Sequence, residues 1–205
     1  KLGVKYKIIG GYVYAKAPKG LIGNVIKFPK VSVGATENLI IAASLSKGET
    51  ILKNCAIEPE IQDLINFLRR MGCNIKWTGK RTITILGTKS LKELNYRIMF
   101  DRIEAGTYMI ASALTGGNFK IVNIIPKVIK TEIDILKKVG ATIKIKGTEL
   151  RIIGRKKIKN IKLTTSPYPG FPTDLQAQIM VLLCKSFGRS EIVEKIFENR
   201  FMHVS

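Results

Sequence analysis

The chain contains 205 residues, of which 45% are hydrophobic and 24% charged, a composition that supports a globular core and excludes an intrinsically disordered chain. No apolar run reaches the about 20 residues that a membrane span requires, and no signal-peptide pattern opens the chain, so we expect a cytoplasmic protein with no membrane partner. The formal charge of +20 is spread along the chain without a basic recognition helix or an aromatic-interleaved RNA motif, which argues against a nucleic-acid partner but remains compatible with an anionic substrate.

The first residues have the pattern of a helix end that leads into a strand. Gly3 stands where a glycine often ends a helix in the left-handed conformation, and the alternating apolar residues Val4, Tyr6 and Ile8 predict a strand. No helical segment precedes them. We therefore expect residue 1 to be a cut end, so that the chain is an internal piece of a larger protein, either an expressed fragment or the product of a broken gene.

The same pattern returns at Gly72 and Gly140, with a period of about 68 residues. The first complete copy predicts, in order, a strand near 24–28, a helix that includes 39–43, a strand at 50–52, a helix over 60–71, and a hairpin of strands 74–77 and 82–86. The second copy predicts elements at 103–114, 119–124, 132–139, 142–145 and 149–153, and half of a third copy predicts elements at 161–165, 175–186 and 191–196. Units of this kind bury their sheets by packing in groups, so the repeat predicts an α/β (α+β) fold.

Two stretches depart from the repeat and are candidates for function. One is KVSVGAT at 30–36, and the other is FPTDLQAQ at 171–178; both stand at the start of a predicted helix. Together with FENRFMH at 197–203 and GGY at 10–12, they resemble the UDP-N-acetylglucosamine enolpyruvyl transferase family. The resemblance runs in collinear order over essentially the whole chain, which corresponds to the middle half of such an enzyme.

The resemblance implies a fold of two similar domains, each an inside-out α/β barrel of three repeated units, with substrates bound in the cleft between the domains. On that basis residues 1–98 are the C-terminal part of the first domain and residues 99–205 are the start of the second. Both portions are incomplete, and the missing N- and C-terminal parts of the same enzyme are expected to pack against them.

The resemblance also implies an activity: transfer of the enolpyruvyl group of phosphoenolpyruvate to the 3-hydroxyl of UDP-N-acetylglucosamine, the first committed step of peptidoglycan synthesis. No cofactor is implied. The family's cysteine loop and a Lys-Asn pair that grips phosphoenolpyruvate fall before residue 1, and a further arginine falls beyond residue 205. We therefore expect the fragment alone to be inactive.

Asp174 is the residue that the resemblance places beside the sugar hydroxyl, as the catalytic general base and a contact to UDP-N-acetylglucosamine. The local sequence offers a competing interpretation, because Thr173 and Gln176 form a capping-box pattern and an acidic residue in a first helical turn complements the helix dipole. A helix start also lowers the pKa of a carboxyl group and weakens it as a base, so desolvation in a closed cleft would have to act against that effect.

The resemblance assigns Lys30, Ser32, Val33 and Gly34 to the uridine and diphosphate of the nucleotide sugar, and Ile196 to an apolar contact with it. Backbone amides at a helix start beside a lysine suit an anion, and a glycine allows close approach of the backbone. A serine-capped helix with a surface lysine fits the same local sequence equally well.

The remaining polar residues of the matched segments are expected to have structural roles. These residues are Glu58, Glu60, Asp101 and Arg102, of which Asp101 and Arg102 are expected to form ion pairs. Arg200 is expected to be structural or to contact an anion, and His203 is expected to be packed. The cysteines Cys55, Cys73 and Cys184 lack metal-binding spacing and match no catalytic position, so we expect buried, reduced thiols and no metal site.

Three alternatives remain open. One is the shikimate-pathway enolpyruvyl transferase, which shares the architecture. Another is a basic nucleic-acid-binding repeat protein without catalytic activity. The last is the inactive product of a decayed gene.

Overall fold

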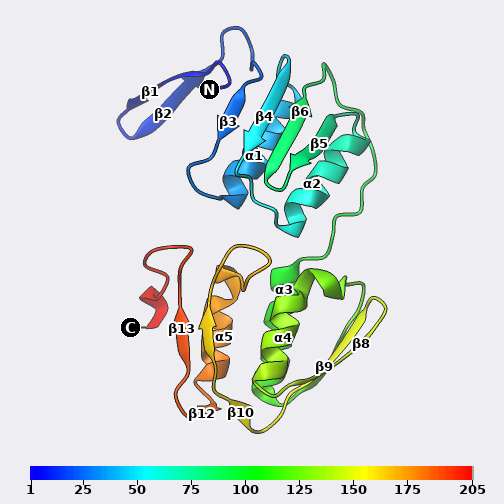
Figure 1. Cartoon of the computed structure of the whole chain (residues 1–205), viewed down its shortest axis with the longest axis vertical. Coiled ribbons are helices and arrows are strands. Elements are labelled where there is room, and N and C mark those ends of the chain that lie inside the picture. The colour runs from blue at the N-terminus through cyan, green and yellow to red at the C-terminus, as the bar shows by residue number, and fades with distance from the viewer. Residues whose placement is uncertain (205) are drawn as a thin grey trace. The chain divides into compact units, whose positions relative to one another are not determined.

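The computed structural model describes residues 1–204 and separates the chain into two compact units, of which the first is Lys1–Met99 and the second begins at Phe100 (Figure 1). This division lies one residue from the boundary between 98 and 99 that the resemblance implies. The assignment of the units to the first and second domains of an enolpyruvyl transferase stays a prediction. Each unit has a hydrophobic core of its own.

The first unit consists of a hairpin and one complete repeat. Strands β1 (Lys5–Ile9) and β2 (Tyr12–Lys16) form the antiparallel hairpin, which projects from the rest of the unit in Figure 1. The repeat contains β3 (Val25–Lys27), α1 (Val33–Ser44), β4 (Glu49–Lys53), α2 (Pro59–Arg70), β5 (Asn74–Gly79) and β6 (Thr82–Leu86). Its sheet has the order β3-β4-β6-β5, with β3 parallel to β4 and the other pairs antiparallel. The element order predicted from the repeat is confirmed.

Both helices of the first unit pack on the four-stranded sheet because each presents apolar residues on one side. Helix α2 buries Ile61, Ile65 and Leu68, which recur at helical spacing, and β6 buries Ile83 and Ile85 at the alternate spacing of a strand. Helix α1 begins at Val33, inside the stretch 30–36 that was predicted to start a helix, and it includes 39–43. A serine cap at Ser32 starts it.

The second unit contains a complete repeat followed by half of another. Its helices are α3 (Arg102–Thr115), α4 (Lys130–Lys138) and α5 (Gln176–Leu183), and its 3₁₀ turns are η1 (Pro126–Ile129), η2 (Thr173–Leu175) and η3 (Met202–Val204). Strands β7 (Asn118–Ile121), β8 (Thr142–Lys146) and β9 (Glu149–Ile153) form an antiparallel sheet of order β7-β9-β8. Strand β10 (Ile158–Lys159) pairs in parallel with β12 (Ser186–Phe187), and β11 (Lys162–Thr164) pairs in parallel with β13 (Glu191–Val193). The helix predicted over 175–186 is shorter because Ser186 and Phe187 pair with β10 instead.

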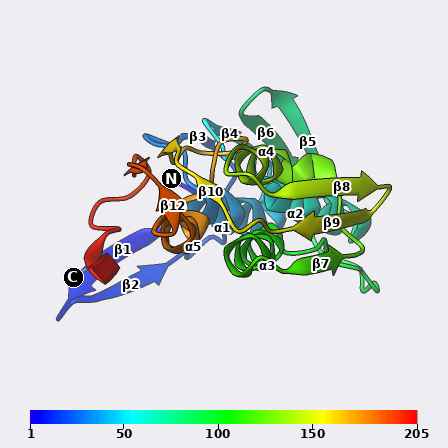
Figure 2. The ribbon, with the colours of Figure 1, turned by 90° about the horizontal axis from the view of Figure 1, so that it is seen from below.

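Helix α3 packs closely against η2 and α5 in the core of the second unit. Figure 2 views α3 and α4 nearly end-on, beside the β7-β9-β8 sheet. A Cβ added to Gly106 would lie 2.4 Å from Cδ1 of the buried Leu175, so only glycine allows the observed approach. This contact holds η2, the turn that carries Asp174, against α3.

Candidate functional site

Helix α1 starts with a serine cap that leaves its first amides available. Ser32 has an extended backbone, and its Oγ accepts a hydrogen bond of 3.3 Å from the amide of Ala35. The amides of Val33 and Gly34 occupy the first two helical positions and have no acceptor within α1. The cap predicted by the competing interpretation is confirmed, and it is compatible with an anion site because it consumes a different amide.

The buried Thr36 fixes this helix start to the rest of the first unit. Its Oγ1 donates to the carbonyl of Ser32 at 2.7 Å and accepts from the amide of Ala56 at 3.1 Å. On the outer side, Lys30 is exposed, and a Cβ added to Gly34 would meet no atom within 4 Å. The amides at the start of α1 therefore face open space beside a positive charge, which is chemistry suited to a phosphate group.

Asp174 lies in the short 3₁₀ turn η2, which is not started by a capping box. Pro172 holds the position before the turn without a side-chain cap, and the Oγ1 of Thr173 donates to Oε2 of Glu194 at 2.8 Å instead of capping α5. The capping-box interpretation of Thr173 and Gln176 is therefore wrong. A residue 21 positions away in the sequence takes the hydroxyl that the local pattern assigns to a cap.

The Asp174 carboxylate points to Arg200. Its Oδ1 lies 3.2 Å from Nη2 of Arg200, and the side chains are 56% and 40% exposed. An ion pair with this exposure contributes little to folding stability. Arg200 also stands over the ring of Phe197 at 5.1 Å, which restricts its guanidinium. The pair thus brings together one charged group of the motif FPTDLQAQ and one of the motif FENRFMH.

Glu194 is the residue that joins these two motifs, and the sequence analysis missed it. One oxygen of its carboxylate accepts from the amides of Ile196 at 2.7 Å and Phe197 at 3.2 Å, while the other accepts from Thr173. Burial, the largest single cause, acts to raise the pKa of Glu194, but the hydrogen bonds from Ile196, Thr173, Thr165 and Phe197 together outweigh it and hold this pKa below its ordinary value. The only signal in the sequence is an acidic residue inside the strand predicted at 191–196, which says nothing about its distant partner.

Asp174 and Ile196 therefore belong to one group of residues, which is held in place by hydrogen bonds to Glu194. Ile196 is half-buried, and the Glu194 carboxylate fixes its amide, as it fixes the hydroxyl of the residue before Asp174. Lys30, Ser32, Val33 and Gly34 form a separate group at the start of α1 in the first unit. Within its own unit, each set has accessible polar groups on an ordered backbone.

Several residues expected to be structural behave differently from the expectation. Arg102 does pair with Glu132, with 3.9 Å between Nη1 and Oε1, but Asp101 caps α3 by accepting from the amides of Ile103 and Glu104. The prediction of an ion pair for Asp101 is wrong, because the helix start offers its carboxylate two amides.

The predictions for two further side chains are also wrong. His203 is exposed in the terminal turn η3 and not packed. Cys184 is exposed beyond the end of α5, while Cys55 and Cys73 are buried as predicted. Burial raises the pKa of the Cys55 thiol to about 11, so this thiol is unreactive at neutral pH.

Neither a metal centre nor a membrane span emerges from the coordinates of residues 1–204. In this range no three His, Cys, Asp or Glu residues gather closely enough to hold a metal ion. None of the helices described is both long and apolar enough to cross a bilayer.

Known proteins resemble this chain over its whole length. UDP-N-acetylglucosamine 1-carboxyvinyltransferase from Pelagibacter ubique is 73% identical over 205 residues, which are 100% of this chain and 49% of the relative. UDP-N-acetylglucosamine 1-carboxyvinyltransferase 1 from Clostridium acetobutylicum is 51% identical over 203 residues, which are 99% of this chain and 48% of that relative. The chain spans about half the length of the curated relatives it matches.

Solved structures show the same fold at low sequence identity. The enolpyruvyl transferase NikO from Streptomyces tendae has a TM-score of 0.86 and 21% identity, and the match covers 99% of this chain and 51% of that one. EPSP synthase from Acinetobacter baumannii has a TM-score of 0.61 and 21% identity, over 93% of this chain and 45% of that one. The predicted enolpyruvyl transferase fold is confirmed, although the sheets of residues 1–204 do not close into a barrel.

The sequence model of one protein family, described as EPSP synthase (3-phosphoshikimate 1-carboxyvinyltransferase), matches residues 1–205. This match covers both units, and with them the start of α1 and the segment from Asp174 to Arg200. The chain therefore belongs to the EPSP synthase family of enolpyruvyl transferases, which are enzymes.

Proposed function

We propose that the protein containing this chain transfers the enolpyruvyl group of phosphoenolpyruvate to the 3-hydroxyl of UDP-N-acetylglucosamine, the first committed step of peptidoglycan synthesis in the cytoplasm. The observation that carries the proposal is the 73% identity, over the whole chain, to a relative named for this carboxyvinyl transfer. By this function the protein acts in cell-wall synthesis and thereby in cell shape and division.

Asp174 is proposed to accept the proton of the sugar hydroxyl. In this reaction the hydroxyl oxygen bonds to the central carbon of phosphoenolpyruvate, the methylene carbon gains a proton and then returns one, and phosphate leaves. A carboxylate that is positioned but still accessible suits the first proton transfer. Asp174 meets both requirements, because Arg200 directs it and over half of its side-chain surface is exposed.

The start of α1 is proposed to hold the nucleotide part of the donor sugar. The amides of Val33 and Gly34, with Ser32 and Lys30 beside them, would contact the diphosphate and uridine, and Ile196 would provide an apolar contact. The support is chemical: amides without acceptors in α1, an exposed lysine and open space at Gly34.

The proposal is tested on the complete gene product by measuring phosphate release from phosphoenolpyruvate in the presence of UDP-N-acetylglucosamine. Asp174→Asn keeps the size of the side chain but removes the base, and it is expected to lower turnover by at least about a hundredfold. Asp134→Asn is the matched control, because Asp134 is a carboxylate of the same unit that pairs with Lys130 on the surface of α4. Unchanged turnover in Asp174→Asn would refute the role of this residue as base.

Gly34→Ala tests the nucleotide-sugar contact in the same assay. The added methyl group meets no protein atom within 4 Å, so the variant is expected to keep the thermal midpoint of the unmodified protein. It intrudes only on a bound ligand, so the KM for UDP-N-acetylglucosamine is expected to rise by about tenfold, which corresponds to one lost contact of this kind. An unchanged KM together with an unchanged midpoint would remove Gly34 from the site.

A second candidate is the shikimate-pathway reaction, which is favoured by the description of the matching family and by the fold of EPSP synthase. It predicts turnover with shikimate 3-phosphate and none with UDP-N-acetylglucosamine. The same phosphate-release assay, run with each acceptor in turn, separates the two reactions.

A further inference from the structure

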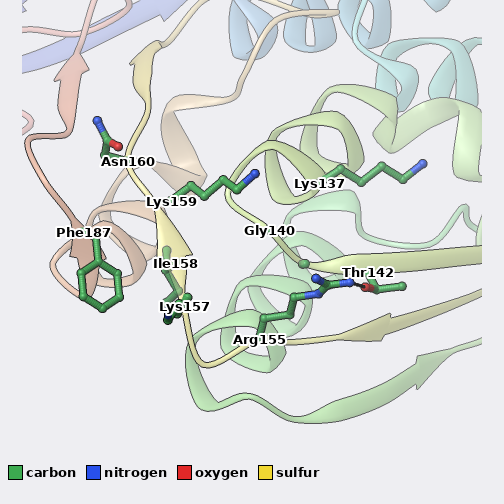
Figure 3. A pocket seen from close by; sticks show the side chains of 10 residues that line it. Lys137, Gly140, Thr142, Arg155, Lys157, Ile158, Lys159, Asn160 and Phe187 are labelled. Atoms are coloured by element: carbon green, nitrogen blue, oxygen red, sulfur yellow. Dashed lines mark hydrogen bonds between the residues drawn. The ribbon is translucent and has the colours of Figure 1, made fainter.

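A hollow of about 700 Å³ lies in the second unit, apart from the residues assigned to the substrate. It is formed by the end of α4, the start of β8, strand β10 with the segment before it, and strand β12. The residues that matter for its chemistry are Lys137, Arg155, Lys157, Lys159, Asn160 and Phe187 (Figure 3).

The charge of the hollow is entirely positive. Two lysines and an arginine come from the short segment 155–159, a third lysine ends α4, and no carboxylate lines the hollow. Within residues 1–204, none of these four cations takes part in an ion pair. Two carboxylates of the same unit are engaged elsewhere, since Glu149 pairs with Lys120 and Glu191 pairs with Lys162. Mutual repulsion of the four cations is thus uncompensated, which favours an anion in the hollow.

One of the four cations has a structural reason of its own. Lys137 stands in the last turn of α4, where a positive charge offsets the negative end of the helix dipole. Its ammonium points away from Arg155 in Figure 3. The helix end opposes anion binding, so the case for an anion depends on the other three cations, which lie outside any helix.

Arg155 and Asn160 are held in place by hydrogen bonds. Nη2 of Arg155 donates to Oγ1 of Thr142 at 3.2 Å, which fixes the guanidinium (Figure 3). Nδ2 of Asn160 donates to the carbonyl of Arg189 at 3.0 Å, so its Oδ1 remains as an acceptor. One positioned cation and one positioned acceptor are more than a general excess of lysine provides.

Phe187 adds an aromatic face to the basic hollow. Its side chain lines the hollow from β12 and is 67% exposed, although a phenyl ring gains by leaving water. Figure 3 shows it on the opposite side of β10 from Arg155 and Gly140. A planar ring and phosphate-binding cations that line one hollow are the combination that binds a nucleobase together with its phosphates.

The hollow is separate from the proposed substrate contact at Asp174. Asp174 precedes α5, whereas Phe187 follows its end, and a helix of eight residues is about 12 Å long. A ligand in the hollow therefore does not need to touch the Asp174–Arg200 pair.

We propose that this hollow binds a nucleoside diphosphate or triphosphate. Arg155, Lys157 and Lys159 contact the phosphates, and the base stacks on Phe187. The site is distinct from the proposed nucleotide-sugar site and does not depend on the reaction assigned to the protein.

The test is calorimetric titration of the complete gene product with ADP, UDP and inorganic pyrophosphate. The double variant Arg155→Gln/Lys159→Gln is expected to weaken ADP and pyrophosphate by tenfold or more, and Phe187→Ser to weaken ADP about tenfold while leaving pyrophosphate unchanged. Lys144→Gln, which removes an exposed lysine of β8 outside the hollow, is the charge control and is expected to change the affinity less than twofold. Because all substituted side chains are exposed, a thermal melt of each variant is expected to match that of the unmodified protein.

Several outcomes would overturn the proposal. The absence of any binding of ADP or UDP would overturn it. Equal loss of ADP affinity in Lys144→Gln and in the double variant would also overturn it, because only the overall charge of the protein would then attract the ligand. Loss of ADP binding in Lys30→Gln but not in the double variant would place ADP at the start of α1. An unchanged ADP affinity in Phe187→Ser would exclude the stacked base. UDP binding that Lys30→Gln weakens and the double variant does not is binding at the start of α1, and it does not count as binding in the hollow.

Discussion

Glu194 shows how one side chain can organise the candidate site of the second unit. Its carboxylate accepts hydrogen bonds from Thr173, beside Asp174, and from the amides of Ile196 and Phe197. Asp174 is exposed and makes only a surface ion pair, so its position depends on the backbone that Glu194 fixes. The candidate base was identified from its motif, whereas the residue that positions it was found only in the structure.

The lowered pKa of Glu194 predicts how stability changes with pH. A carboxyl group whose pKa is lower in the folded than in the unfolded state stabilises the fold above its ordinary pKa of 4.5, and this contribution is lost as pH falls through the folded-state value. Glu194→Gln is therefore expected to lower the thermal midpoint of the complete gene product at pH 7, and the difference from the unmodified protein is expected to shrink below about pH 4. Melting curves from pH 3 to 8 measure this.

Glu191→Gln serves as the control for that experiment. Glu191 begins β13, the strand that ends directly before Glu194, but it pairs with Lys162 on the surface, where both side chains are largely exposed. Its variant is expected to change the midpoint little at any pH. A Glu194→Gln difference that stays constant from pH 3 to 8 would contradict the assignment of the lowered pKa.

At the scale of elements, a segment without helix or strand is anchored near its end by residues of helix α2. Residues 87–101 form no regular structure, yet Tyr96 donates its hydroxyl to Oδ1 of Asp63 at 2.8 Å, and the amide of Met99 donates to Oδ2 at 3.3 Å. The Tyr96 ring also packs edge-on against Phe67. Burial, followed by the hydrogen bond to Asp63, raises the pKa of Tyr96, so the hydroxyl stays a donor at neutral pH. Helix α2 thus holds the end of the first unit.

Removing this anchor is expected to expose the segment to protease. It contains Lys89, Lys92 and Arg97, at which trypsin cleaves once the backbone is free. Asp63→Ala removes two hydrogen bonds to this segment. Their loss is expected to make local opening of the segment roughly tenfold more frequent, so trypsin is expected to cleave within 87–101 about tenfold faster. Limited trypsin digestion followed by mass spectrometry measures the rate. A rate equal to that of the control Asp134→Ala would show that Asp63 does not hold the segment.

At the scale of the whole molecule, the amino-acid sequence determined the family, the order of elements and the candidate motifs. Periodic apolar residues specify helices and strands locally. The glycines at 3, 72 and 140 mark the repeat, and each of them has a positive φ. The start of α1 was also readable, because a serine cap acts on an amide only three residues away. These features depend on near neighbours in the chain.

The tertiary structure alone decided the contacts between distant residues. It showed that Thr173 serves Glu194 and not a capping box, that Cys184 and His203 are exposed, and that a basic segment and Phe187 share one hollow. Each of these facts depends on which elements pack together. A hydrogen-bond donor or a charge takes the best partner that packing brings within reach, and a local pattern does not contain that information.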